Sequence, residues 1–353
     1  MPSDGIFYLI LLMILCGTFS IVGNINQLVS YYCKKKFFPN NDNIFNKNTK
    51  ILINLLHIIY LLLTLAIPYL VLERIQESWI LGNETCIFNR ILIMLERSTK
   101  LWLIMFITLF QYKEYTQLKR QLQNSTTKND YFSKFSLKIS LFIMIIVSGS
   151  LILIMLPNCG AFKIILQTFY IDTIKIDIKQ IKCGISVSDL YFSIVYGYSF
   201  MVEFFIPGII CLTIIIKWII CIKKDPNQNN ISLKYLSFIK SVFIFLFLSF
   251  YIFLPHWCVL LLKIYGYDVF GDDIAEYLIW LFDELSNINI SLSPSISWLP
   301  LMYLSNHLSE DENNELSNKK FYTSNKYITN YKRSSTQNVI QQRKYRSTNK
   351  IEK

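Results

Sequence analysis

The stretch that most constrains the fold runs from 86 to 112, an apolar run interrupted by charges. It contains no Pro or Gly and is long enough to cross a bilayer with some tilt. Arg90, Glu96, Arg97 and Lys100 lie within it, and each charge at membrane depth costs about 2.5–3.5 kcal/mol unless it faces protein or water. Three of them recur at helical spacing, so they share one face. We therefore predict a helix buried among other helices, with its charged stripe turned inward.

The composition is too apolar for an ordinary soluble domain, with 53% hydrophobic and 17% charged residues and a positive mean hydropathy. The net charge of +11 does not indicate a nucleic-acid partner. The basic residues cluster in loops and in the tail, where membrane topology explains them. Proline within apolar runs also favours packed membrane helices, which tolerate it; these prolines are Pro68, Pro157, Pro207, Pro255, Pro294 and Pro300.

The sequence predicts an all-α membrane protein, a seven-transmembrane helix bundle over 6–308. The expected spans are 6–32, 51–72, 86–112, 137–157, 191–222, 236–263 and 278–304, with a kink at Pro68. The first apolar run resembles a secretory signal but lacks a basic start and continues past any plausible cleavage site, so we expect it to stay uncleaved. The polar tail, 309–353, is expected to be cytoplasmic and disordered.

The Lys and Arg counts of the loops predict the orientation. The loops at 33–50, 113–135 and 223–234 carry thirteen, and those at 73–85, 158–190 and 264–277 carry five. Cytoplasmic loops carry the excess of basic residues, so the N-terminus is expected outside and the C-terminus inside.

Two cysteines stand on the predicted outer side. Cys86 opens the third span and Cys183 lies in the second outer loop, where an oxidising compartment permits a disulfide; two free thiols are the alternative. In the same loop, 174–179 alternates apolar and polar residues as a half-exposed strand does, which predicts a hairpin over the mouth of the bundle. Asn83 begins an outward-facing glycosylation sequon. Asn124 and Asn230 begin sequons that the topology places inside.

Together these features resemble the rhodopsin-like (class A) G-protein-coupled receptors, in particular those of invertebrate peptides. The resemblance covers about 6–308 and is carried by Gly23-Asn24 in the first span, Trp79 before Cys86, Pro207, Pro255 in FYIFLPHW, and Pro300 to Tyr303 in LPLMY. It implies a multi-pass plasma-membrane protein that passes the binding of an extracellular ligand to heterotrimeric G proteins. It also implies no enzymatic activity, no cofactor and no metal.

The departures from the family pattern concern activation. The D-R-Y triplet reads Phe110-Gln111-Tyr112, and the acidic position of the sixth helix, which engages that Arg in the family, reads Tyr235. The sixth-helix Trp is replaced by Phe253, and the NPxxY Asn by Leu299. The alternative function is therefore a seven-helix binding or decoy receptor with impaired coupling.

Lys100 lies where a family member places a sodium-coordinating hydroxyl, while the sodium-binding Asp of the second helix falls on Ile59. The Lys100 ammonium would then replace the charge of the ion. The simpler alternative is that Lys100 only neutralises Glu96, four residues earlier.

The resemblance also places a ligand pocket among the third, fifth, sixth and seventh helices, lined by Ile93, Met94, Arg97, Glu203, His256 and Trp257. Ile93 replaces the Asp of aminergic receptors, which argues against a cationic amine. Arg97 and Glu203 are expected to form either a closed ion pair or a pair that opens for a ligand carboxylate or an amidated peptide end.

The acidic residues of the third outer loop are either solvated or attract a basic peptide; they are Asp268, Asp272, Asp273 and Glu276. With the predicted hairpin, they favour a neuropeptide ligand. A membrane enzyme or transporter is not expected, because the chain has three His in all, no HExxH, no Gly-rich phosphate loop and no evident inverted repeats.

Overall fold

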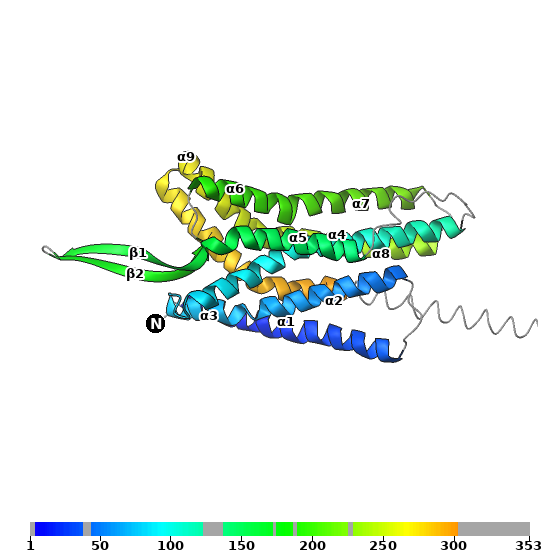
Figure 1. Ribbon diagram of the computed structural model, residues 1–353, viewed down its shortest axis with the longest axis horizontal. Coiled ribbons are helices and arrows are strands. Elements are labelled where there is room, and N and C mark those ends of the chain that lie inside the picture. The colour runs from blue at the N-terminus through cyan, green and yellow to red at the C-terminus, as the bar shows by residue number, and fades with distance from the viewer. Residues whose placement is uncertain are drawn as a thin grey trace, which may run out of the picture. The chain divides into compact units, whose positions relative to one another are not determined.

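Helix α4 (Asn83–Leu122) packs against helices on several sides in the computed structural model. The structure describes residues 4–37, 44–122, 137–171, 174–185, 189–224 and 229–302. Every residue of α4 from Leu101 to Phe110 is buried, and the helix contacts α2, α5, α7 and α8 (Figure 1). The predicted inward stripe is confirmed at Arg97 and Lys100, which are buried together with Glu96, whereas Arg90 is half-buried.

The surrounding elements follow the apolar runs of the sequence. They are α1 (Asp4–Phe37), α2 (Ile44–Thr64), α3 (Ile67–Gln76), α5 (Leu137–Met155), α6 (Asp189–Phe200), a π-helical segment Met201–Phe205, α7 (Ile206–Lys223), α8 (Asn229–Leu261), a second π-helical segment Leu262–Gly266, α9 (Tyr267–Phe270) and a final helix over 272–302. The structure is therefore mostly helical, as predicted.

Five stretches among the described residues are long and apolar enough to cross a membrane: Phe7–Cys33, Lys47–Gln76, Leu137–Asn158, Ile194–Lys223 and Tyr235–Leu261. This is compatible with a membrane protein. The third and seventh predicted spans are helical but are not among the five. Charges lower the apolar character of α4, and Asp283, Glu284 and several Ser and Asn residues lower that of the final helix.

Some predicted boundaries shift in the structure. The second span is one apolar stretch, Lys47–Gln76, and the expected kink takes the form of a break at 65–66, just before Pro68 in the first turn of α3. Proline suits that position because its missing N–H would have no helical partner there. The polar loop expected at 33–50 is helical at both ends, since α1 continues to Phe37 and α2 begins at Ile44. The outer loop expected at 264–277 is helical except at Gly271.

The strands β1 (Cys159–Ile171) and β2 (Ile174–Ile185) form the predicted hairpin. They are antiparallel, with Ala161 opposite Cys183 and a register shift between Ile165 and Gln167. The base of the hairpin contacts α4. Its far half extends away from the helices rather than across them, which differs from the expected cover over the bundle mouth (Figure 1).

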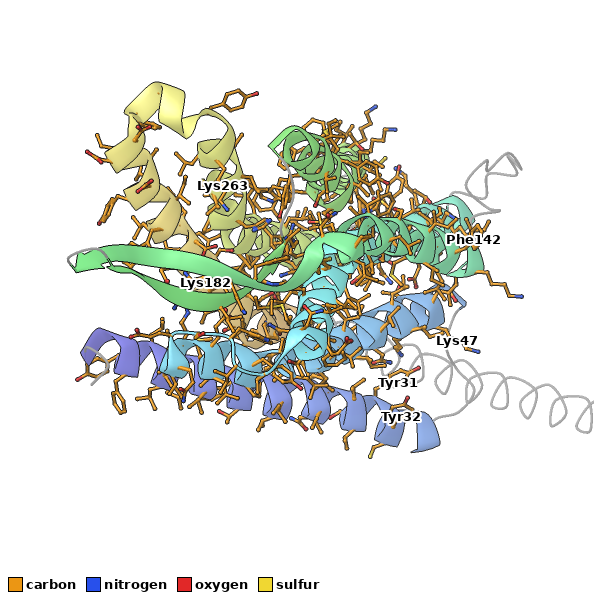
Figure 2. All side chains as sticks on the ribbon, turned by 60° about the vertical axis from the view of Figure 1, so that its left-hand side comes forward. Tyr31, Tyr32, Lys47, Phe142, Lys182 and Lys263 are labelled. Carbon is orange, nitrogen blue, oxygen red and sulfur yellow. A yellow bond between two sulfur atoms is a disulfide. The ribbon has the colours of Figure 1, made fainter. Side chains whose placement is uncertain are left out.

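The helices have a hairpin end and an opposite end, and the residues labelled in Figure 2 mark the two. Lys182 on β2 and Lys263 after α8 lie toward one end, whereas Tyr31, Lys47 and Phe142 lie toward the other (Figure 2). Contacts agree with this arrangement. Arg74 of α3 pairs with Glu284 of the final helix near the hairpin end, and Gln111 of α4 bonds to Thr49 of α2 near the opposite end.

Candidate functional site

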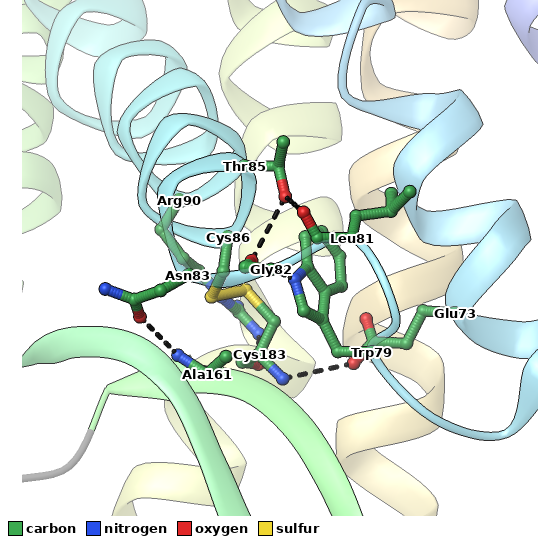
Figure 3. Close-up of a disulfide and its surroundings, with 10 residues drawn as sticks. All are labelled: Glu73, Trp79, Leu81, Gly82, Asn83, Thr85, Cys86, Arg90, Ala161 and Cys183. Carbon is green, nitrogen blue, oxygen red and sulfur yellow. Dashed lines mark hydrogen bonds between the residues drawn. A yellow bond between two sulfur atoms is a disulfide. The ribbon is translucent and has the colours of Figure 1, made fainter.

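A disulfide joins the start of α4 to the hairpin. Cys86 and Cys183 are bonded, with their Cα atoms 5.5 Å apart, so the predicted bridge is confirmed (Figure 3). Trp79 is buried beside it. The Trp79 backbone N–H donates to Ile181 O at 2.7 Å, and its indole N–H donates to Gly82 O at 2.7 Å. Trp79 thus fixes both the turn before α4 and strand β2.

Polar side chains hold the hairpin base on both strands (Figure 3). Asn83 Oδ1 accepts a hydrogen bond from Ala161 N at 2.9 Å, and Glu73 Oε1 accepts one from Cys183 N at 3.4 Å. Arg90 Nη2 donates to Cys183 O. Strand residues close to the disulfide are therefore anchored to α3 and to the first two turns of α4.

Farther along α4, Arg97 forms the predicted ion pair with Glu203. Arg97 Nε and Nη2 both donate to Glu203 Oε2, at 3.1 and 2.8 Å. Both side chains are buried, at 10% and 4% exposure. The Arg97 guanidinium also lies over the Trp257 ring, 5.5 Å from its centroid. The two charges are neutralised by each other and screened by an aromatic ring.

A π-helical turn positions Glu203. In Met201–Phe205, the Ile206 N–H bonds to Met201 O, five residues earlier, instead of to Val202 O. The freed Val202 carbonyl accepts the indole N–H of Trp102 from α4 at 2.9 Å. Pro207 follows directly and has no N–H to offer. Sequence reasoning missed Trp102, whose only signal was a Trp within the buried run of α4.

The predicted pocket residues divide into two groups. Met94 and Trp257 belong to one buried cluster, against which Phe200 packs, and Trp257 contacts both Phe200 and His256. The Phe200 and Trp257 rings meet edge to face at 5.0 Å. Ile93 lies in a different cluster with Leu63, Ala66 and Leu92. The structure therefore groups five of the six predicted residues and places Ile93 against α2.

Several buried polar atoms in this region have no hydrogen-bond partner among the described residues. They are both amide atoms of Asn89, Arg90 Nε, Glu203 Oε1, His256 Nε2 and Trp257 Nε1. Leaving a buried donor or acceptor unsatisfied costs about 1–3 kcal/mol. A buried polar atom without a partner calls for an explanation, such as a water or a bound polar group. We refer to Arg97, Glu203, His256 and Trp257 as the polar cluster.

One turn deeper, Lys100 is completely buried. Its ammonium lies 3.3 Å from Glu96 Oε1 and donates to Ser293 Oγ at 3.0 Å. Ser293 in turn donates to Glu96 Oε1 at 2.8 Å. The predicted pairing with Glu96 is thus confirmed, within a triad that joins α4 to the final helix. Phe253 lies 5.1 Å from the ammonium, and Tyr60 and Phe245 complete the aromatic surroundings.

Pro255 lies inside α8, and Asn289 of the final helix donates to the carbonyl that the proline leaves without a helical donor. Because Pro255 has no N–H, the carbonyl of Tyr251 has no helical donor at that position. Asn289 Nδ2 donates to Tyr251 O at 3.4 Å and to Ile252 O at 3.2 Å. The signal for this contact in the sequence is an Asn within a predicted helix that follows a predicted helix containing proline.

At the other end of α4, Gln111 is buried and donates to Thr49 Oγ1 at 3.1 Å. Tyr235 lies in an aromatic group with Tyr115 and Trp218, whose ring centroids lie 5.1 and 5.6 Å from it. Pro300 borders a groove of about 470 Å³ between α8 and the final helix. Tyr303 lies outside the described residues.

A second, apolar groove of about 250 Å³ lies between α4, α7 and α8 and shares no residue with the predicted pocket. Phe204, Phe205, Gly208, Phe243 and Phe250 are among its lining residues. Its largest side chains are exposed on predicted membrane-spanning helices. It therefore lies on the outer surface of the helices and is separate from the polar cluster.

Comparison of the sequence with known protein families and with curated proteins finds no match.

Proposed function

We propose that this chain is a multi-pass receptor of the plasma membrane, built as a seven-helix bundle with its N-terminus outside and its C-terminus inside. In this proposal it is a divergent rhodopsin-like receptor that binds an extracellular ligand, with a neuropeptide favoured, and activates a heterotrimeric G protein. The observation that carries the proposal is the polar cluster, which lies below a disulfide-anchored hairpin and joins α4, the π-helical turn and α8.

The placement of the cluster supports a binding site reached from outside. Arg97 follows Cys86 by eleven residues, about three helical turns, so the cluster lies below the disulfide at the hairpin end. The final helix begins at the same end with Asp272, Asp273 and Glu276, all exposed. Acidic residues near the entrance favour the approach of a basic peptide.

The test is a peptide-library screen on cells that express the protein, with G-protein activation read directly. A responding peptide should lose at least tenfold in potency with Arg97→Ala, because Glu203 is then left as an unpaired buried charge. Arg74→Ala, which breaks the ion pair with Glu284 outside the cluster, is the matched control and should keep its potency. Equal potency for wild type and Arg97→Ala at equal surface expression would remove Arg97 from the site.

A second candidate function is a binding receptor that does not couple, and Gln111 favours it. Gln111 carries no charge and its amide bonds to Thr49. If labelled peptides bind at the cell surface without G-protein activation, and Gln111→Arg produces activation, the uncoupled receptor is the correct description. Activation by the unmodified protein would exclude it.

A further inference from the structure

The polar cluster is neutral as a whole, yet three of its buried polar atoms have no partner among the described residues: Glu203 Oε1, Trp257 Nε1 and His256 Nε2. Glu203 neutralises Arg97 through a single oxygen, Oε2, which receives both guanidinium hydrogen bonds. Its second oxygen, Oε1, is buried and has no partner among the described residues. The same holds for Trp257 Nε1, which can only donate. Both residues contact Arg97, so this acceptor and this donor belong to side chains that meet at one guanidinium.

A carboxylate does not match this arrangement. It would bring a second negative charge toward Glu203 Oε1, and it has no hydrogen to donate to that oxygen. An ammonium would satisfy Oε1 but would add positive charge beside Arg97 and leave Trp257 Nε1 unpaired. A primary carboxamide carries no charge, donates through its NH₂ group and accepts through its oxygen.

We propose that the polar cluster binds a primary carboxamide, such as the amidated C-terminus of a peptide. The amide NH₂ donates to Glu203 Oε1, and the amide oxygen accepts from Trp257 Nε1. The Arg97–Glu203 pair stays closed and acts as the receptor for this group. The proposal rests on the proposed function in one respect, namely that a ligand from outside reaches this depth.

The neighbouring walls favour an aromatic residue next to the amide. Phe200 meets the Trp257 ring edge to face, and the Tyr196 ring lies 6.4 Å from His256. Met94 belongs to the same buried cluster and adds a flexible apolar surface. Aromatic rings pack well edge to face on such surfaces.

Arg90 does not alter the choice between amide and acid at the cluster. It precedes Arg97 by seven residues, so it lies about 10 Å nearer the hairpin along the helix axis. Its Nη2 is bound to Cys183 O. An anionic group would be held there, beside the disulfide, and not between Glu203 and Trp257.

The experiment uses the purified full-length protein in detergent and two probes that differ only in the group in question. These are N-acetyl-phenylalanine amide and N-acetyl-phenylalanine, added in rising millimolar concentrations while thermal unfolding is followed. We expect the amide to raise Tm by about 1–3 °C at saturation and to bind about tenfold more tightly than the acid. Equal or tighter binding of the acid, or no shift with either probe, would overturn the proposal.

Two variants test the named atoms. Glu203→Gln leaves Arg97 as an uncompensated cation, so the preference should reverse in favour of the acid. The matched control is Glu276→Gln, an exposed carboxylate at the start of the final helix, which should keep the amide preference. Trp257→Phe keeps a ring over Arg97 but lacks the N–H, and the amide should then bind about tenfold more weakly. This second variant decides the matter if Glu203→Gln fails to fold.

The outcomes separate this proposal from the proposed function. Amide binding without G-protein activation by any peptide would leave the amide site standing and the signalling role without support. Activation by peptides with a free C-terminal carboxylate, together with acid binding at the cluster, would support signalling and refute the amide site.

Discussion

At the scale of single residues, Lys100 shows how this protein keeps a charge in its interior. Its ammonium is fully buried, with Glu96 and Ser293 as polar partners and three aromatic rings around it. Glu96 supplies the opposite charge, and Ser293 bonds to both groups. A buried pair of this kind contributes little net stability, but breaking it leaves one bare charge inside the protein.

Lys100→Met should therefore be strongly destabilising, by about 3–5 kcal/mol, because Glu96 loses its counter-charge. The double variant Glu96→Gln, Lys100→Met should recover most of that loss, since no buried charge remains. Thermal unfolding of the purified proteins measures both, with Lys182→Met, an exposed hairpin lysine, as the control. If Lys100→Met unfolds at the wild-type temperature, the triad has no structural role.

At the scale of elements, two helical stretches lack a backbone hydrogen bond, and in each a neighbouring helix supplies the missing donor. Trp102 of α4 donates to the Val202 carbonyl at the π-helical turn, and Asn289 of the final helix donates to the Tyr251 carbonyl one turn before Pro255. Irregular backbone in a membrane-spanning helix requires such partners, because lipid offers no hydrogen bonds. Each of these hydrogen bonds also fixes one helix against another.

Asn289→Ala should cost about 1 kcal/mol in the wild-type background, because the Tyr251 carbonyl loses its donor. In a Pro255→Ala background the restored N–H can bond to Tyr251 O, so the same change should cost clearly less. Thermal unfolding of the four proteins in this double-mutant cycle gives the coupling between the two residues. Additive losses would show that Asn289 does not act through the turn before Pro255.

At the scale of the whole molecule, the structural features that depend on local properties can be predicted from the sequence. The helical runs follow from hydropathy and the Cys86–Cys183 bridge from side and compartment. The Arg97–Glu203 pair follows from the resemblance, which places both residues in the pocket, and from the need of each charge for a partner. The contacts that depend on how one helix is rotated against the next cannot be predicted in this way. Examples are the hydrogen bonds of Trp102, Asn289 and Ser293 and the packing of Ile93 against α2.

The proposed orientation predicts where glycan is added. Asn83 is exposed at the start of α4, and its Oδ1 is used by Ala161 N while its Nδ2 has no bond among the described contacts. The protein from eukaryotic cells should therefore shift in mobility on treatment with a glycosidase that removes N-linked glycan, and Asn83→Gln should abolish that shift. Asn124→Gln and Asn230→Gln are the matched controls and should leave it unchanged. Glycan at Asn124 or Asn230 would show that loops predicted to be cytoplasmic lie outside, and would contradict the proposed orientation.

The π-helical turn limits where residues can be deleted from the sequence and where chimaeras can be joined. The backbone hydrogen bond of a π-helical turn joins residues five apart, one more than the four of an α-helix, so the turn contains one extra residue. Each residue rotates a helix by about 100°. Deleting one residue from Met201–Phe205 would thus leave α7 in place and turn all of α6 by about 100°, carrying Phe200 away from Trp257. Chimaeras of this protein should be joined outside the five-residue segment. The side-chain register of α6 and that of α7 differ by one residue across it, so a junction inside the segment would rotate one helix relative to the other.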